Sequence, residues 1–228
     1  MLLLDTSSKY LSLAVAEDTK ILSQMRRMLD RKHSLRLAVL IDKILKRAQV
    51  PLKKIDGFCI GRGPGSFTGL RIGITAVKGL AFVLRKPVVA IPSLDILAQA
   101  FRRIKPTAQQ LCVIIDAKQN KVYSCLYRID NNRIKRSSRY LLLPLDELMR
   151  NLKGEVLFLG DAIKIYRERI AKSKNIKASF AEEKFWYPRV AQAVSIACER
   201  FQKKRFDDAN SLVPLYLYPQ ECQIKSRS

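Results

Sequence analysis

Three runs of apolar residues open the chain, each separated from the next by a short polar turn. The runs lie at 2–7, 10–18 and 20–26, and the second alternates apolar with polar residues. Alternation with a period of two between turn residues is typical of β-strands. The pattern therefore predicts an antiparallel meander of three strands at the start of the chain.

Helical spacing replaces this alternation after the meander. Apolar residues recur every three or four positions over 34–48, where Ser34 can cap the first turn and Pro51 ends the helix. The other elements predicted for the first half are a buried strand, an apolar helix, a strand and a further helix, at 55–61, 69–85, 87–91 and from Ser93.

The second half repeats this order. Its predicted elements are three strands, a helix, a strand and two helices, at 111–117, 121–130, 133–142, 144–152, 155–160, after Asp161 and at 188–204. Asp5 and Asp116 each end the first strand of one copy. The duplication resembles the ground plan of the actin, Hsp70 and sugar-kinase superfamily.

This resemblance implies an α/β, actin-like (ASKHA, ribonuclease H-like) duplicated fold with two lobes, each with a mixed sheet and helices. We expect an N-terminal lobe at 1–103, which carries the glycine-rich loop and partner-binding helices, and a C-terminal lobe at 104–217. Residues 218–228 are polar and are expected to form a flexible tail.

Composition narrows the classes of function. The formal net charge is +23, from 43 Lys and Arg against 20 Asp and Glu, and such a field attracts polyanions or an acidic partner. No apolar run approaches the roughly 20 residues of a membrane span, so we expect a cytoplasmic protein with no membrane contact. The five scattered cysteines predict no disulfide framework. The single histidine, His33, excludes every two-histidine metal motif.

The most informative motif is the stretch GRGPGSFTGLRIG at 61–73. It predicts a strand end, a tight loop and a helix start capped by Ser66 or Thr68, where free backbone amides can hold an anion. It lacks the Gly-Lys-Ser/Thr of a P-loop and the flanking glycines of a nucleophile elbow. The candidate anion- or nucleotide-binding residues are Asp5, Thr6, Ser7, Gly63, Gly65 and Ser66, although Asp5 is interpreted first as a turn former at a strand end.

The helix expected after this loop is apolar on all sides, since Arg71 and Lys78 are its only charged residues up to Leu84. Such a helix must be covered on all sides. Either the helix at 34–48 covers it within the monomer, or a second polypeptide does. We favour a subunit interface formed by Leu35, Ala38, Val39, Asp42, Gly69, Leu70, Gly73, Ala76 and Val77.

These residues also carry a resemblance to a known family. The opening LLLDTS, the pair His33-Ser34, the stretch GRGPGSFTGLRIG, Ala76-x-Lys78-Gly79-Leu80-Ala81 and IPSLD at 91–95 together resemble TsaB, also called YeaZ. The likeness is dense over about residues 1–100 and thin afterwards.

The resemblance implies a non-catalytic subunit of the bacterial machinery that makes threonylcarbamoyladenosine on tRNA. Its expected partners are a TsaD-type paralogue, bound through the helices at 34–48 and 69–85, and a TsaE-type ATPase in the same complex. We expect a homodimer when the chain is alone, and direct contact with tRNA stays open on charge alone. No catalytic residue, metal or cofactor is expected, whereas weak nucleotide binding is left open because Thr6, Ser7, Ser8 and Lys9 can still hold an oxyanion.

Three alternative functions differ in the residues that each one needs. An independent ATPase or kinase of the same fold needs phosphate-binding hairpins with glycine, and the turns after Asp5 and Asp116 contain none. A peptidase needs a metal cluster or an activated nucleophile, which the sequence does not offer. A basic tRNA-binding module is supported by charge and predicts salt-sensitive binding.

Overall fold

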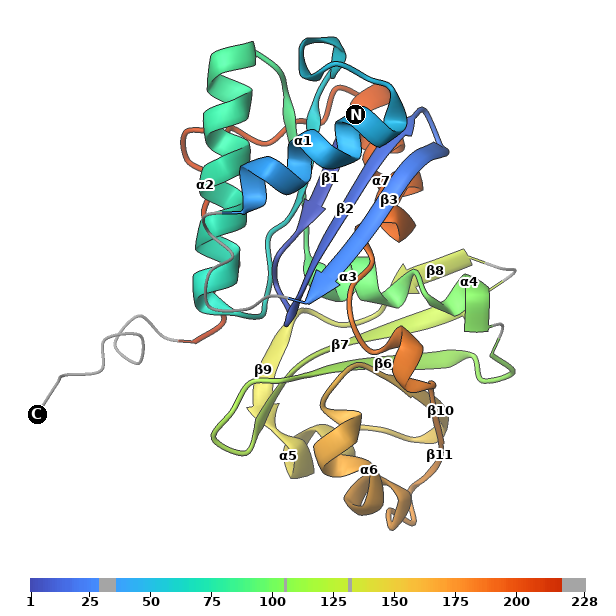
Figure 1. Ribbon diagram of the computed structural model, residues 1–228. Helices are drawn as coiled ribbons and strands as arrows, with labels where there is room; N and C mark the ends of the chain where they lie inside the picture. The colour runs from blue at the N-terminus through green and yellow to red at the C-terminus, as the bar shows by residue number, and fades with distance from the viewer. Residues whose placement is uncertain (29–35, 105, 131–132, 219–228) are drawn as a thin grey trace, which may run out of the picture. The chain divides into compact units, whose positions relative to one another are not determined.

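The computed structural model describes residues 1–28, 36–104, 106–130 and 133–218. The chain divides into two compact units, Met1–Ile96 with Tyr187–Pro214, and Leu97–Trp186 with Leu215–Ser228. Each unit contains one mixed sheet (Figure 1).

The first unit is built from five strands and their helices. They are β1 (Leu2–Asp5), β2 (Tyr10–Glu17), β3 (Lys20–Met28), α1 (Leu37–Ala48), the 3₁₀ helix η2 (Leu52–Lys54), β4 (Phe58–Gly61), α2 (Phe67–Leu84), β5 (Val88–Ile91), α3 (Ser93–Ala98, which runs across the unit boundary), the 3₁₀ helix η4 (Val190–Ala193) and α7 (Val194–Gln202). The sheet order is β3-β2-β1-β4-β5, with β1, β2 and β3 antiparallel and β1, β4 and β5 parallel.

The second unit repeats this topology. Its elements are α4 (Phe101–Ile104), β6 (Gln110–Asp116), β7 (Lys121–Asp130), β8 (Arg133–Arg136), β9 (Leu141–Pro144), α5 (Leu145–Arg150), β10 (Gly154–Leu159), α6 (Ile163–Ala171), β11 (Ile176–Phe180) and the 3₁₀ helix η3 (Glu183–Phe185). The sheet order is β8-β7-β6-β10-β11, which matches β3-β2-β1-β4-β5 of the first sheet strand for strand. The additional strand β9 pairs with β7. The predicted duplicated α/β fold is therefore confirmed.

The local predictions need three corrections. The single strand predicted at 133–142 is two strands, β8 and β9, which both pair with β7. The strand β11 was not predicted: its sequence IKASF alternates apolar with polar residues, but the run is only five residues long and none of them is fully buried. The helix predicted at 188–204 begins as 3₁₀ and continues as α7. The helix predicted at 34–48 is described from Leu37, so its proposed cap, Ser34, lies outside the described residues.

The lobe boundary also differs from the one expected at 103/104. The segment Tyr187–Pro214 belongs to the first unit, because η4 and α7 bury Val190, Ala193 and Ala197 against the face of the first sheet that carries Leu3 and Ala14. Residues 219–228 of the expected tail lie outside the described residues, whereas the Tyr218 hydroxyl donates to the Ala117 carbonyl at 2.9 Å.

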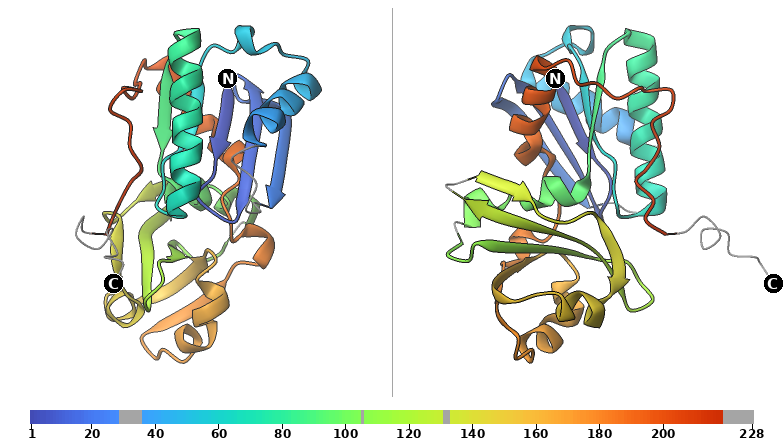
Figure 2. Two further views of the ribbon diagram at one scale, coloured as in Figure 1. Left: turned by 60° about the vertical axis from the view of Figure 1, so that its left-hand side comes forward. Right: turned by 180° about the vertical axis from the view of Figure 1, so that it is seen from behind.

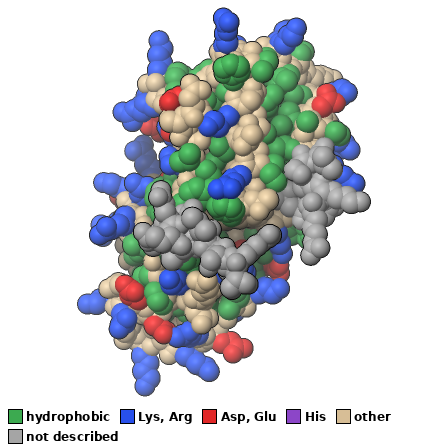
Figure 3. Space-filling view, turned by 90° about the vertical axis from the view of Figure 1, so that its left-hand side faces the viewer, with side chains coloured by type: hydrophobic (Ala, Val, Ile, Leu, Met, Phe, Trp, Pro, Cys, Tyr) green, Lys and Arg blue, Asp and Glu red, His purple; other side chains and the backbone are tan. Residues whose placement is uncertain are grey.

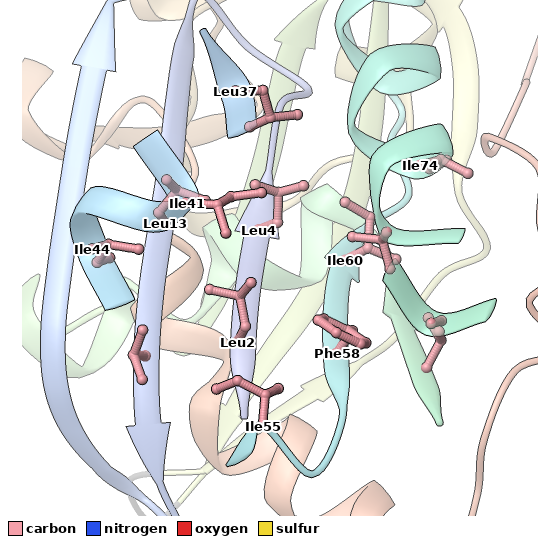
Figure 4. Packing of buried hydrophobic residues seen from close by; sticks show 14 of the residues in the cluster. Leu2, Leu4, Leu13, Leu37, Ile41, Ile44, Ile55, Phe58, Ile60 and Ile74 are labelled. Carbon is pink, nitrogen blue, oxygen red and sulfur yellow. The ribbon is translucent and has the colours of Figure 1, made fainter. Parts of the chain in front are cut away.

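The two faces of the first sheet pack against different helices. Leu2, Leu4 and Leu13 point to the side of α1 and α2, where they meet Ile41 and Ile74 (Figure 4). Residues of alternate position point to the side of α7, which Figure 2 shows on the opposite face of the sheet. The alternation recognised in the sequence therefore separates two apolar layers within one unit.

Candidate functional site

The glycine-rich stretch joins β4 to α2 through a tight loop. Ser66 caps α2, since its Oγ accepts a hydrogen bond from the Gly69 amide at 3.2 Å, so Ser66 and not Thr68 is the cap. Gly65 has a φ of +156°, and a Cβ at this position would lie 2.1 Å from the Ser7 carbonyl oxygen. Only glycine lets the loop approach the first strand so closely.

Asp5 ties this loop to the end of β1. Its Oδ1 accepts from the amide and the hydroxyl of Ser7, at 3.0 and 2.8 Å, and its Oδ2 accepts from the Ser93 hydroxyl at 2.8 Å. Ser93 in turn accepts from the Gly63 amide at 3.1 Å. The Ser66 amide completes the connection by donating to the Ser7 carbonyl at 2.7 Å.

Burial and hydrogen bonding act in opposite directions on the pKa of Asp5. The side chain is fully buried, and loss of solvation raises its pKa more than the hydrogen bonds from Ser7 and Ser93 lower it. The six candidate anion-binding residues thus lie together at one loop. Asp5, Thr6 and Ser7 are buried, however, and the exposed Ser66 uses its hydroxyl as a cap.

The corresponding aspartate of the second unit also forms a turn. Asp116 Oδ1 accepts from the Lys118 amide at 2.9 Å, and its Oδ2 pairs with the Lys118 ammonium. The Asp116 amide donates to Asp161 Oδ1 at 3.1 Å. Both strand-end aspartates therefore stabilise local loops in the way that the turn interpretation anticipates.

A hollow of the first unit lies between α1 and α2. This α1–α2 groove has a volume of about 1160 Å³. Its apolar wall is formed mainly by Leu37, Ile41, Leu45, Ile72, Leu80 and Val83. Asp42, Lys46 and Arg71 supply charge along it, and Asp42 and Lys46 pair at 2.8 Å. Figure 3 shows hydrophobic side chains gathered along this face of the first unit.

The expected interface residues divide into four groups. Ala38, Asp42 and Ala76 line the groove. Val39 is 63% exposed but is not part of the groove lining, and Leu35 lies outside the described residues.

The prediction of an interface was wrong for the remaining four residues. Gly69, Leu70, Gly73 and Val77 are buried inside their own unit and present no surface to a partner. A Cβ on Gly69 would lie 2.2 Å from the Thr6 carbonyl oxygen, and one on Gly73 would lie 2.3 Å from the Thr6 hydroxyl. These glycines allow α2 to approach its own β1, because the buried stripe of α2 turns toward the sheet.

The sequence did contain a signal for the missed side of α2. Ile72, Thr75, Gly79 and Val83 line the groove and recur every three or four residues. This spacing defines one helical stripe, next to the stripe of Leu70, Ile74, Val77 and Ala81 that packs in the core. Two neighbouring apolar stripes explain why the helix looked apolar on all sides.

Among the described residues, α2 is the helix long and apolar enough to cross a membrane by length and composition. The expectation that no run approaches such a length is therefore corrected. The helices that pack in protein cores pass the same test, and one stripe of α2 does pack on the sheet.

Within the described part of the chain, no group of three or more His, Cys, Asp or Glu side chains is placed to hold a metal ion. His33 lies outside that part.

Two units with the same five-strand order define an α/β protein of the actin-like class. The family model TsaD, described as tRNA N6-adenosine threonylcarbamoyltransferase, matches residues 21–226. The chain is 27% identical to the tRNA threonylcarbamoyladenosine biosynthesis protein TsaB of Bacillus subtilis, covering 99% of this chain and 96% of that protein. It is 28% identical to TsaB of Escherichia coli, covering 95% and 94%.

A solved structure gives the same result. YeaZ from Pseudomonas aeruginosa superposes with a TM-score of 0.79 at 28% identity, covering 95% of this chain and 98% of that one. The chain therefore belongs to the TsaD family in the broad sense of that model, and within it to the TsaB (YeaZ) group of tRNA threonylcarbamoyladenosine biosynthesis proteins. Its role lies in the biosynthesis of threonylcarbamoyladenosine on tRNA.

Proposed function

We propose that the chain is a non-catalytic partner subunit that binds and supports a TsaD-type transferase through the α1–α2 groove. The observation that carries the proposal is the groove itself, an apolar hollow of about 1160 Å³ left open along two helices of the first unit. Exposed apolar patches of this kind mark surfaces that bind other proteins.

The chemistry of the groove favours a folded protein partner. Val83, 76% exposed, borders it on α2, and the other apolar lining residues continue across to α1. A standard interface buries about 800 Å² per partner around a few apolar anchors with a polar rim. Asp42, Lys46 and Arg71 supply charged groups that can fix the orientation of a partner.

The strand-end aspartates support a non-catalytic role. The carboxylate of Asp5 is enclosed and holds the glycine-rich loop through three donors, and Asp116 is paired with Lys118. A nucleotide-processing member of this fold class needs such an aspartate free to act at the phosphates. In this proposal, catalysis resides in the paralogue, a TsaE-type ATPase joins the same cytoplasmic complex, and a second copy occupies the groove when the paralogue is absent.

The experiment is co-purification with the TsaD-type paralogue, combined with titration calorimetry. Val83→Glu places a charge on the groove wall, so binding loses the burial of a valine and must desolvate a carboxylate. These two costs together are expected to raise the Kd at least about 100-fold. Phe82→Glu is the matched control, because Phe82 is 79% exposed on the same helix but does not line the groove.

The proposal predicts that the Phe82→Glu variant still binds, and that tRNA modification requires both proteins. Equal loss of binding in the two variants, or undiminished binding by the Val83→Glu variant, contradicts the assignment of the groove. Turnover of a nucleotide by the isolated chain contradicts the non-catalytic role.

A further inference from the structure

A cluster of cations and tyrosines lies in the first unit, on the sheet face opposite the α1–α2 groove. It consists of Lys9, Tyr10, Arg26, Tyr187 and Arg189, which we call the Tyr10–Arg26 cluster. Tyr10 and Ser12 of β2 alternate with Leu11 and Leu13, which pack on the α1 side, and Ser12 pairs with Arg26 across the strands. Residues 187–189 approach from the far end of the sequence, where the Val190 amide donates to Ser12 Oγ at 3.0 Å.

Stacking fixes the guanidinium of Arg26 in this cluster. Its central carbon lies 3.7 Å from the centroid of the Tyr10 ring and 5.5 Å from that of Tyr187. The two rings meet edge to face at 5.1 Å, and the Lys9 ammonium lies 4.7 Å from the Tyr187 centroid. Cation–π stacking engages the face of a guanidinium and leaves its in-plane N–H donors directed outward.

One of these N–H donors of Arg26 lacks an acceptor. The Nε of Arg26 is buried and makes no hydrogen bond. A buried donor without a partner costs free energy, and an arrangement of this kind in a native protein calls for a missing acceptor. The planar edge of an arginine matches the oxygens of a phosphate group, which it can bind with two parallel hydrogen bonds.

The space beside Arg26 is also electropositive. A hollow of about 180 Å³ is lined by Ser12, Leu13, Gln24, Met25, Arg26 and Arg189, and none of these described residues is acidic. Burial, together with the neighbouring charge of Arg189, holds the pKa of Arg26 below its ordinary value. A cation whose charged form is disfavoured by burial and by a neighbouring cation is stabilised when an anion binds beside it.

We propose that the Tyr10–Arg26 cluster binds a phosphate group of an RNA backbone. RNA is the source favoured by the formal net charge of +23 and by the role of the family in tRNA modification. Free inorganic phosphate offers the same chemistry and is separated from RNA by the test. The proposal does not depend on the α1–α2 groove, because the two sites use opposite faces of the first sheet.

The test measures binding of an unmodified tRNA transcript to the purified full-length chain over a series of salt concentrations. Arg26→Gln is expected to raise the Kd about tenfold or more and to lower the slope of log Kd against log salt by about one. Arg27→Gln is the matched control, since it removes the same charge from the next residue of β3, which is exposed and pairs with Leu11 on the other side of the strand. It should change the Kd by about threefold or less.

Equal effects of Arg26→Gln and Arg27→Gln would show that only net charge matters and would overturn the proposal. Thermal melting checks that each variant is folded, and Arg189→Gln replaces Arg26→Gln if the latter unfolds. In a second arm, inorganic phosphate is titrated while melting is followed. Stabilisation that requires Arg26, combined with unchanged tRNA binding by Arg26→Gln, would assign the site to free phosphate and overturn the RNA assignment. Pairing with the paralogue is measured in parallel and should be unchanged in Arg26→Gln, so failure here and failure of the proposed function are distinguishable.

Discussion

Replacing Gly73 by alanine tests whether α2 is held against β1 by its glycines. The new Cβ would lie 2.3 Å from the Thr6 hydroxyl oxygen and 3.1 Å from its methyl carbon. Real Cβ atoms essentially never come within 3.0 Å of a heavy atom from a non-neighbouring residue. Thr6 is 2% exposed and β-branched, so its side chain has little freedom to rotate away from the new atom. Either the Thr6 side chain or the helix must therefore shift.

Two opposing effects set the size of the change. Alanine stabilises a helix interior by about 1 kcal/mol relative to glycine. Overpacking a rigid core costs about 1–3 kcal/mol, and the close contact with Thr6 places Gly73 near the upper value. Gly73→Ala is thus expected to destabilise the protein by about 2 kcal/mol. Gly79→Ala is expected to stabilise it by about 1 kcal/mol, because no atom lies within 4 Å of a Cβ at that position of the same helix.

Thermal melting of the two variants measures this difference, at about 2–4 °C per kcal/mol for a chain of this size. A second comparison uses Thr6→Ala, which removes both clashing atoms. In that background Gly73→Ala should no longer destabilise, and the coupling between the two substitutions should be about 2–3 kcal/mol. Similar melting temperatures for Gly73→Ala and Gly79→Ala, or no coupling to Thr6, would refute this account of the helix.

Two further predictions concern carboxylates of the first unit that accept several hydrogen bonds. Because burial raises the pKa of Asp5 in the folded state, its contribution to stability is full below its ordinary pKa and is lost as pH rises through the raised value. The free energy of unfolding of the wild type should therefore fall relative to that of Asp5→Asn as pH rises above the ordinary pKa of an aspartate, and urea denaturation showing a constant or rising difference would contradict it. Asp207 Oδ2 accepts from the Ala90 amide at 2.7 Å and from Arg200 at 2.9 Å, so Asp207→Ala should destabilise the first unit by about 1–3 kcal/mol. Hydrogen exchange at the Ala90 amide checks this prediction. Unchanged protection of that amide in the Asp207→Ala variant would contradict it.

The sequence was most informative where neighbouring residues decide the structure. Alternation in the opening strands predicted both the meander and the two faces that it presents, since the side-chain period of a strand is fixed. The repeated order of elements predicted the second sheet in the same way. The boundary between the units was wrong because periodicity identifies α7 as a helix but does not indicate which of two sheets it covers. That choice depends on contacts such as Ala193 and Ala197 with Leu3, which is about 190 residues away in the chain.

The candidate sites show the same limit: a sequence pattern does not reveal which residues tertiary packing brings together. Apolarity on all sides of α2 was recognised, yet the pattern did not reveal that Gly69 and Gly73 face inward while Thr75 and Val83 face the groove. The Tyr10–Arg26 cluster gave no local signal, because Tyr187 and Arg189 join it only through tertiary packing. In the sequence, Arg26 was one of two consecutive basic residues. In the structure, it is partly buried and stacked whereas Arg27 is exposed.

One pair of strands carries one of the two proposed surfaces and supports the other. Leu13 and Met25 pair across β2 and β3 and support the layer beneath α1, and the next pair, Ser12 and Arg26, faces the basic hollow. A shift of one residue in this pairing would move every side chain to the wrong face. The sheet can therefore hold a protein partner on one side and an RNA phosphate on the other without competition between them. A non-catalytic subunit with this arrangement would act by binding its enzyme and its substrate at the same time.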